Sequence, residues 1–159
     1  MKREQGLLIG LVVLVIGTVI LLWSFAVPNF RPLDFPKIQS GTLTAGPMRT
    51  HRALTDNEIA RINDWLAAHR SGWGPLGQTP PSSGDALYTL QPVGRPGEPP
   101  PPPMTMTLWL GISGPDWNDT VFIEPQPGAV IRLRSFSKHE FAPLREIVEP
   151  QPFQRSGFP

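Results

Sequence analysis

The pattern of hydrophobic and polar residues divides the chain into an apolar N-terminal run and a mixed body. Residues 6–27, GLLIGLVVLVIGTVILLWSFAV, contain no charged side chain. As a helix rising about 1.5 Å per residue, they would extend about 33 Å, enough to cross a hydrocarbon core of roughly 30 Å. The pattern therefore predicts a single transmembrane helix, preceded by a short cytoplasmic N-terminus at residues 1–5.

A cleavable signal peptide is the alternative interpretation of this run, because residues 24–26 place small side chains at a suitable spacing. Signal peptides have an apolar region of roughly 7–15 residues, so the longer run favours an uncleaved anchor. Lys2 and Arg3 lie closer to the run than the cationic residues on its other side. The charge pattern therefore predicts an inner (plasma) membrane protein with a cytoplasmic N-terminus and residues 28–159 in the periplasm or another extracytoplasmic space.

Small residues form a stripe along the apolar run. Gly6, Gly10, Gly17 and Ser24 fall within about 40° of one another on a helix that turns about 100° per residue. A stripe of small residues lets another helix backbone approach closely, so we expect this face to pack against a second transmembrane helix, from another subunit or a second copy. The alternative is that these glycines have no packing role, since glycine is frequent in transmembrane helices in general.

The body begins with a proline-containing segment and one strongly marked helix. Residues 28–37 contain three prolines and predict an extended juxtamembrane linker before a domain at residues 38–149. Thr55 and Glu58 have the spacing of a capping box, which predicts a helix over residues 56–70. Its buried stripe is expected to comprise Ile59, Ile62, Leu66 and Trp65.

Alternating residues predict several short strands around a proline-rich loop. Strands are expected at residues 38–46, 85–93, 104–112, 120–124 and 129–136, the first with the weakest pattern. Residues 92–103 form the proline-rich loop, read as a rigid connection between strands, with a ligand for an aromatic groove as the alternative.

A second helical segment closes the body. Ser137 and Glu140 form another capping box, but Pro143 predicts a turn at residues 138–141 and a short helix after it. The tail at residues 150–159 is expected to be irregular. Together the elements predict an α+β fold, with an antiparallel meander of three to five strands covered by two helices.

Charge and composition narrow the chemistry. The chain has no cysteine, and its body beyond the apolar run balances twelve basic with twelve acidic side chains, which argues against a nucleic-acid partner. No nucleotide loop, GxSxG elbow or paired zinc histidines appear, and the HEFAP stretch beginning at His139 lacks the second histidine of HExxH. Asp116, Asn118 and Asp119 are read as turn residues rather than calcium ligands. We therefore expect no cofactor, no metal and no catalytic residue.

Two groups of residues are candidates for contact with partners. Trp109 and Trp117 are large apolar side chains near a turn, and Arg132 and Arg134 are expected on the outer face of one strand. Trp73, between two glycines at a helix end, is interpreted as a plug for the core. The favoured function is an accessory or assembly subunit of a membrane-protein complex. A periplasmic ligand-binding, sensor or inhibitor module and an envelope hydrolase are the alternatives.

Overall fold

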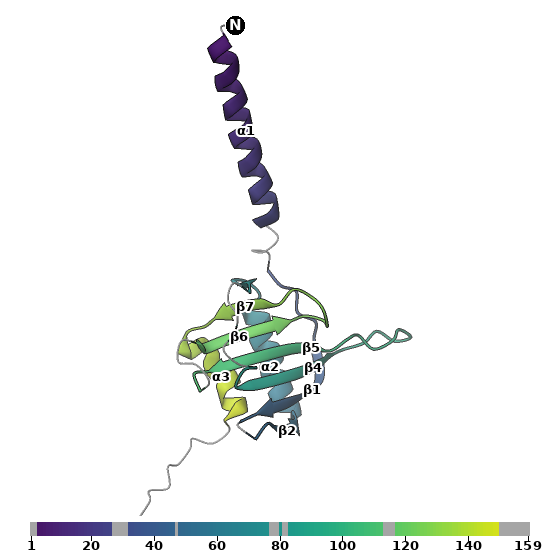
Figure 1. Ribbon diagram of the computed structural model, residues 1–159. Coiled ribbons are helices and arrows are strands. Elements are labelled where there is room, and N and C mark those ends of the chain that lie inside the picture. Colours follow the sequence, from purple (N-terminus) through teal and green to yellow (C-terminus); the bar gives the residue numbers. More distant parts are fainter. Residues whose placement is uncertain are drawn as a thin grey trace, which may run out of the picture.

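The computed structural model describes residues 3–26, 32–46, 48–76, 80, 83–112 and 117–149 (Figure 1). A long N-terminal helix, α1 (Arg3–Ala26), stands apart from a domain that contains one sheet and two helices. The predicted tail at residues 150–159, most of the predicted Asp116 turn and the start of the linker lie outside the described residues. The α+β class and the single apolar N-terminal helix are confirmed.

The sheet has seven antiparallel strands in the order β2-β1-β4-β5-β6-β7-β3, so the prediction of three to five strands was wrong. The two additional strands lie at the sheet edges and are too short to show an alternating pattern, because one has four residues and the other two. The strands are β1 (Ile38–Ala45), β2 (Thr50–Ala53), β3 (Gly74–Pro75), β4 (Ala86–Pro92), β5 (Met104–Leu110), β6 (Asn118–Glu124) and β7 (Arg132–Ser135).

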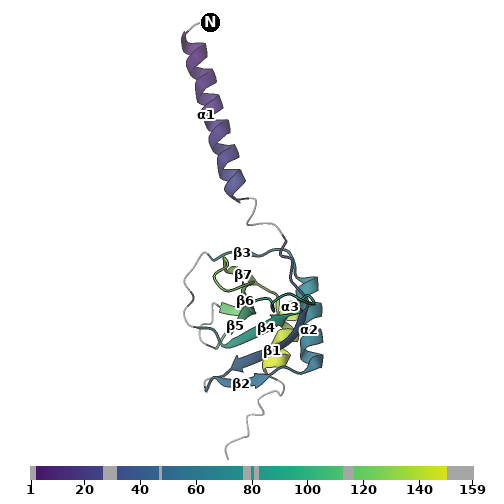
Figure 2. The ribbon, with the colours of Figure 1, turned by 90° about the vertical axis from the view of Figure 1, so that its right-hand side faces the viewer.

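Two helices, α2 (Asp56–Ala68) and α3 (Lys138–Val148), cover the same face of the sheet (Figure 2). Both predicted capping boxes are present: the hydroxyls of Thr55 and Ser137 accept from the backbone N–H groups of Glu58 and Glu140, whose carboxylates accept in return. The α2 helix ends two residues earlier than predicted, with His69 as its C-cap.

The expected break before Pro143 is absent, because α3 runs continuously through this residue. A proline there leaves one carbonyl of the preceding turn without its helical donor. Burial of Phe141, Leu144 and Ile147 against the sheet offsets this loss and keeps the segment helical.

Side chains on the helix-covered face of the sheet form the core, and the opposite face carries both polar and apolar side chains. Each buried methionine and leucine of β5 lies on the covered face, while Thr105, Thr107 and Trp109 lie on the other, as the alternation predicted. The core cluster includes Ile62, Leu66, Tyr88, Leu90, Met104, Met106, Leu108, Val121, Ile123, Phe141, Leu144 and Ile147.

The proline-rich segment projects from the sheet as a narrow arm between β4 and β5 (Figure 1). Leu90 of β4 pairs with Met104 of β5 at its base, and the side-chain amide of Gln91 donates to the carbonyl of Pro101 at 2.6 Å. The segment therefore connects two neighbouring strands of the sheet.

Candidate functional site

The surface of α1 is apolar and is left uncovered by the other residues that the structure describes. Residues 4–24 are all exposed, and Glu4–Ser24 is long and apolar enough to cross a membrane. A Cβ added at Gly6, Gly10 or Gly17 would meet no atom within 4 Å, so the predicted small-residue stripe remains open. Ser24 donates to the carbonyl of Leu21 at 2.6 Å and needs no partner for its hydroxyl.

The juxtamembrane segment, residues 32–37, is bound to the domain. The backbone N–H of Leu33 donates to the carbonyl of Arg70 at 2.7 Å, and the guanidinium of Arg70 binds both the carbonyl of Leu33 and the carboxylate of Asp34. The ring of Phe35 meets the ring of Trp73 edge-on at 5.9 Å between centroids. These contacts hold residues 33–35 against the C-terminal end of α2.

The same segment continues along α2 into β1. The side chain of Asn63 accepts from the N–H of Ile38 at 2.8 Å and donates to its carbonyl at 2.9 Å. The sequence did not reveal this docking, because Asp34 and Arg70 are 36 residues apart and share no periodic pattern. The one signal was apolar Leu33 and Phe35 among prolines, since apolar side chains in an extended linker need a surface to pack on.

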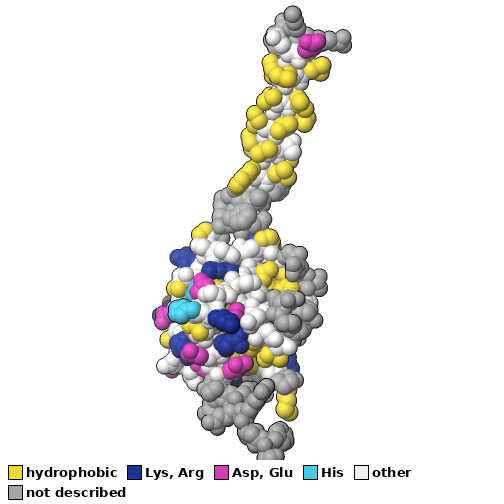
Figure 3. All heavy atoms as spheres, turned by 90° about the vertical axis from the view of Figure 1, so that its left-hand side faces the viewer, with side chains coloured by type: hydrophobic (Ala, Val, Ile, Leu, Met, Phe, Trp, Pro, Cys, Tyr) yellow, Lys and Arg dark blue, Asp and Glu magenta, His cyan; other side chains and the backbone are white. Residues whose placement is uncertain are grey.

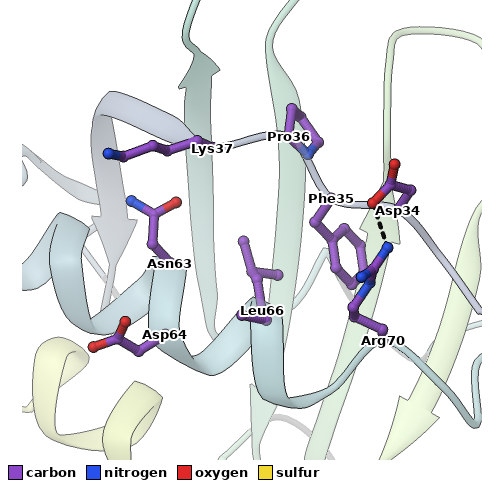
Figure 4. A pocket seen from close by; sticks show the side chains of 9 residues that line it. Asp34, Phe35, Pro36, Lys37, Asn63, Asp64, Leu66 and Arg70 are labelled. Atoms are coloured by element: carbon purple, nitrogen blue, oxygen red, sulfur yellow. Dashed lines mark hydrogen bonds and ion pairs between the residues drawn. The ribbon is translucent and has the colours of Figure 1, made fainter.

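A groove of about 320 Å³ lies between this segment and α2 (Figure 4). We call it the juxtamembrane groove. Leu66 of α2 gives it an apolar floor, and Lys37 and Asp64 stand at its rim (Figure 4). Ala67 of α2 also lines it. The other lining residues are Asp34, Phe35, Pro36, Asn63 and Arg70. An apolar floor with charges of both signs suits a peptide or another amphipathic ligand better than a simple anion.

Trp73 is a core residue, as predicted. It is 2% exposed, and its indole N–H donates to the carbonyl of His69 at 2.6 Å, which satisfies one of the last carbonyls of α2. Its ring lies against Trp65 and Phe136 at 6.4 and 5.6 Å between centroids. Gly72 supplies the positive φ of 81° that turns the chain back toward the helix. The cluster therefore connects the juxtamembrane segment to the domain core.

The four residues expected to form a partner surface lie on opposite faces of the sheet. Arg134 pairs with Val121 and Arg132 with Ile123, and these two β6 residues belong to the core, so both arginines lie on the helix-covered face. The expectation that the arginines lie on the outer face of the strand was wrong. Trp109 lies on the other face, in a different environment.

Arg134 has specific partners on the covered face. Its guanidinium donates to the carbonyl of Ser71 at 2.7 Å and to the carboxylate of Glu140 at 3.2 Å, and it lies over the ring of Phe136. These acceptors explain why the arginine points toward the helices. Hydrogen bonds from Ser137, followed by the charges of Arg134 and His69, lower the pKa of Glu140.

Trp109 and Trp117 form a second aromatic cluster with Phe122 on the open face. The rings of Trp109 and Phe122 lie 4.3 Å apart, and Trp117 is 5.6 Å from Trp109. Trp109 is 2% exposed, and within the described part of the chain its indole N–H has no acceptor. It is therefore a packed side chain rather than an exposed contact, and Trp117 is the more accessible of the two.

Basic and acidic side chains gather over one side of the domain, whereas α1 is hydrophobic along its length (Figure 3). One partly buried ion pair, Arg52 with Glu58, connects three elements. Arg52 binds Glu58 through two hydrogen bonds of 2.9 and 2.6 Å and donates to the carbonyl of Ile147. Hydrogen bonding from Arg52, opposed by desolvation, lowers the pKa of Glu58 to about 2. This pair is structural, because it fastens β2 to both helices.

The candidate catalytic and metal residues do not assemble. Asn118 and Asp119 bind the guanidinium of Arg145 at 3.1 and 2.8 Å, so a cation already occupies these oxygens. His69 and His139 line a groove between α2 and α3, and His51 lies on β2. Within the described ranges, no three His, Cys, Asp or Glu residues are arranged to hold a metal ion.

The comparisons with known proteins give no family for this arrangement. No family model matches the chain, and neither does any curated protein or solved structure. The features that bear on function are therefore the exposed helix, the docked juxtamembrane segment and the surfaces of the domain.

Proposed function

We propose that the chain is a single-pass membrane protein that serves as an accessory or assembly subunit of a membrane-protein complex. One observation carries the proposal: the apolar surface of α1 is fully exposed, while the domain closes its core with residues between Ile38 and Ile147. An apolar helix of this length needs a lipid or protein environment, because its exposure to water is unfavourable. The N-terminus faces the cytoplasm, and the domain lies in the periplasm or another extracytoplasmic space.

The small-residue stripe supports association in the membrane. Gly6, Gly10 and Gly17 leave a shallow surface on which a second helix backbone can pack closely. The docked juxtamembrane segment adds a second property, because it couples the helix to the domain core through Phe35 and Trp73. A partner that binds α1 is thereby held next to the domain, as an accessory subunit requires.

Co-purification from native membranes tests the proposal. Gly10→Leu with Gly17→Leu should abolish capture of a second transmembrane chain, because two leucines fill the packing face. Val15→Leu with Val19→Leu adds bulk to the opposite side of the helix and should leave capture unchanged. Equal capture by wild type and the glycine variant would contradict the docking face. A monomeric wild type with no bound chain would contradict the function.

The orientation has its own test. The chain has no cysteine, so Met48→Cys introduces a unique thiol at an exposed turn of the domain. A membrane-impermeant maleimide should label this thiol in cells whose outer envelope has been made permeable while the plasma membrane stays intact. Labelling only after the plasma membrane is broken would place the domain in the cytoplasm.

The second candidate is a ligand- or protein-binding module on a membrane anchor. The juxtamembrane groove favours it, because an apolar floor meets charges of both signs beside the membrane linker. Ala67→Trp fills this groove from α2 and leaves α1 untouched. Loss of partner capture in this variant, with normal capture by the glycine variant, would favour the module over the accessory subunit.

A further inference from the structure

Two exposed apolar residues, Leu76 and Val130, flank the paired residues of β3 and β7 at one edge of the sheet. β3 pairs with β7 so that Pro75 lies opposite Arg132. Leu76 directly follows Pro75, and Val130 lies two residues before Arg132, so both lie within two residues of this pair. Leu76 is 38% exposed and Val130 is 65% exposed.

The chain from α1 enters the domain at this edge. Phe35 packs on Trp73, the residue directly before β3, and Leu33 binds the end of α2 that leads to Trp73. Figure 2 shows β3 and β7 at the end of the domain that faces α1, while β2 forms the opposite edge of the sheet. The apolar pair and the attachment point of the anchor therefore share one pole of the domain.

The tether between the helix and the domain is short. Ala26, the last residue of α1, and Pro32, the first described residue of the juxtamembrane segment, are six residues apart and can be separated by at most about 22 Å. Six strand spacings of about 4.8 Å separate the β3 edge from the β2 edge, or about 29 Å in all. A membrane-spanning α1 therefore limits how far the β3–β7 edge can lie from the bilayer, whereas the β2 edge lies about 29 Å farther along the sheet.

We propose that the β3–β7 edge rests on the same phospholipid bilayer that holds α1, with Leu76 and Val130 entering the headgroup layer. The inference depends on the proposed membrane anchor. Apolar side chains gain from leaving water at this boundary, and the anchor has already limited the distance they must cross. The sheet then stands on its edge, and the β1–β2 turn that carries Met48 faces away from the lipid.

Single thiols can measure this contact in the full-length protein, because the chain has no cysteine. Val130→Cys and Leu76→Cys carry an environment-sensitive fluorophore, in protein reconstituted into phosphatidylcholine vesicles with or without spin-labelled lipid. The controls are Ile112→Cys, 70% exposed, and Met48→Cys, 89% exposed. Spin-labelled lipid should quench the fluorophore at 130 and 76 several-fold more than at either control position.

The outcomes separate this inference from the membrane anchor. If the labelled protein does not float with vesicles, or alkaline carbonate removes it, the anchor and the lipid contact are both wrong. If it stays inserted but position 130 is quenched no more than position 112, the anchor stands and the lipid contact is wrong. Shielding of position 130 without lipid quenching would show that a protein covers the edge, which also overturns the proposal.

Discussion

Trp73→Ala is expected to remove much of the stability of the domain. The substitution deletes an indole that packs against Phe35, Trp65 and Phe136, and it leaves the carbonyl of His69 without its donor. Truncation of a buried tryptophan to alanine costs about 3–5 kcal/mol. A lost hydrogen bond adds about 1 kcal/mol. A domain of this size has a total stability of about 5–15 kcal/mol, so the loss is a large fraction of it.

Urea unfolding of the full-length protein in detergent, followed by far-ultraviolet circular dichroism, measures this effect. With a slope of about 1.5 kcal/mol per molar urea, a loss of about 4 kcal/mol lowers the midpoint by about 2.5 M. Trp73→Phe keeps part of the packing and should lie between the alanine variant and wild type. The remaining difference in midpoint between Trp73→Phe and wild type reflects the lost hydrogen bond to the His69 carbonyl and the smaller ring.

The same truncation at Trp23 provides the control. Trp23 lies on α1 and is exposed, so Trp23→Ala should leave the unfolding midpoint of the domain unchanged. A Trp73→Ala variant with a wild-type midpoint would refute the assignment of this residue to the core. If that variant also lost partner binding, Trp73 would have to be a contact residue instead.

Three further predictions concern single positions and use the same urea titration. Glu58→Gln keeps the capping box but removes the negative charge that pairs with Arg52. The pKa of Glu58 is lowered from 4.5 to about 2. The carboxylate therefore contributes its full stabilisation of the folded domain above pH 4.5, and this stabilisation is lost as the pH falls toward 2. After allowance for screening by solvent, the free energy of unfolding of wild type should exceed that of the variant by about 1–2 kcal/mol at pH 7 and by less near pH 2. A difference that does not change with pH would contradict the role of the Glu58 charge. Gly84→Ala should cost more than about 2 kcal/mol, because its φ is positive and a Cβ there would lie 2.3 Å from a neighbouring side chain. Gly46→Ala has the positive φ without the close contact and should cost only about 1 kcal/mol; equal losses would contradict the steric argument. Pro143→Ala should raise stability by about 1 kcal/mol, because it restores a helical donor, and a destabilised variant would contradict this account of α3.

Local signals in the sequence predicted the helices well. Thr55 with Glu58 and Ser137 with Glu140 satisfy the first turns of α2 and α3 through contacts only three residues apart. Such contacts depend on neighbours in the chain, so spacing alone reveals them. Pro143 misled the prediction because the packing of α3 on the sheet outweighs the local loss of one hydrogen bond.

Properties that depend on distant partners were harder to predict. β3 consists of Gly74 and Pro75, and it is a strand only because β7 lies beside it. The alternation around Leu133 suggested that Arg134 faces solvent, but the register with β6 puts Leu133 opposite Phe122 and turns the arginine toward the helices. A one-residue change of register exchanges the two faces of a strand, and the sequence of β7 alone does not determine it.

The candidate site also combines features that local sequence predicts with contacts between distant residues that it does not. The exposed apolar helix and its glycine stripe follow directly from a continuous run of residues. The docking of Leu33, Asp34 and Phe35 joins segments more than 30 residues apart, and the apolar side chains of the linker do not identify the surface on which they pack. The apolar run therefore predicts an anchor, whereas the coupling of that anchor to the domain depends on contacts between residues far apart in the chain.

Native mass spectrometry of the protein extracted from the membranes of the cell that produces it tests the central claim most directly. The account predicts a complex that contains the full-length chain, with α1 intact, bound to at least one further transmembrane chain. The complex should dissociate in the variant with Gly10→Leu and Gly17→Leu. A lone chain, or a chain from which the N-terminal helix has been cleaved, would contradict the assignment as an anchored accessory subunit.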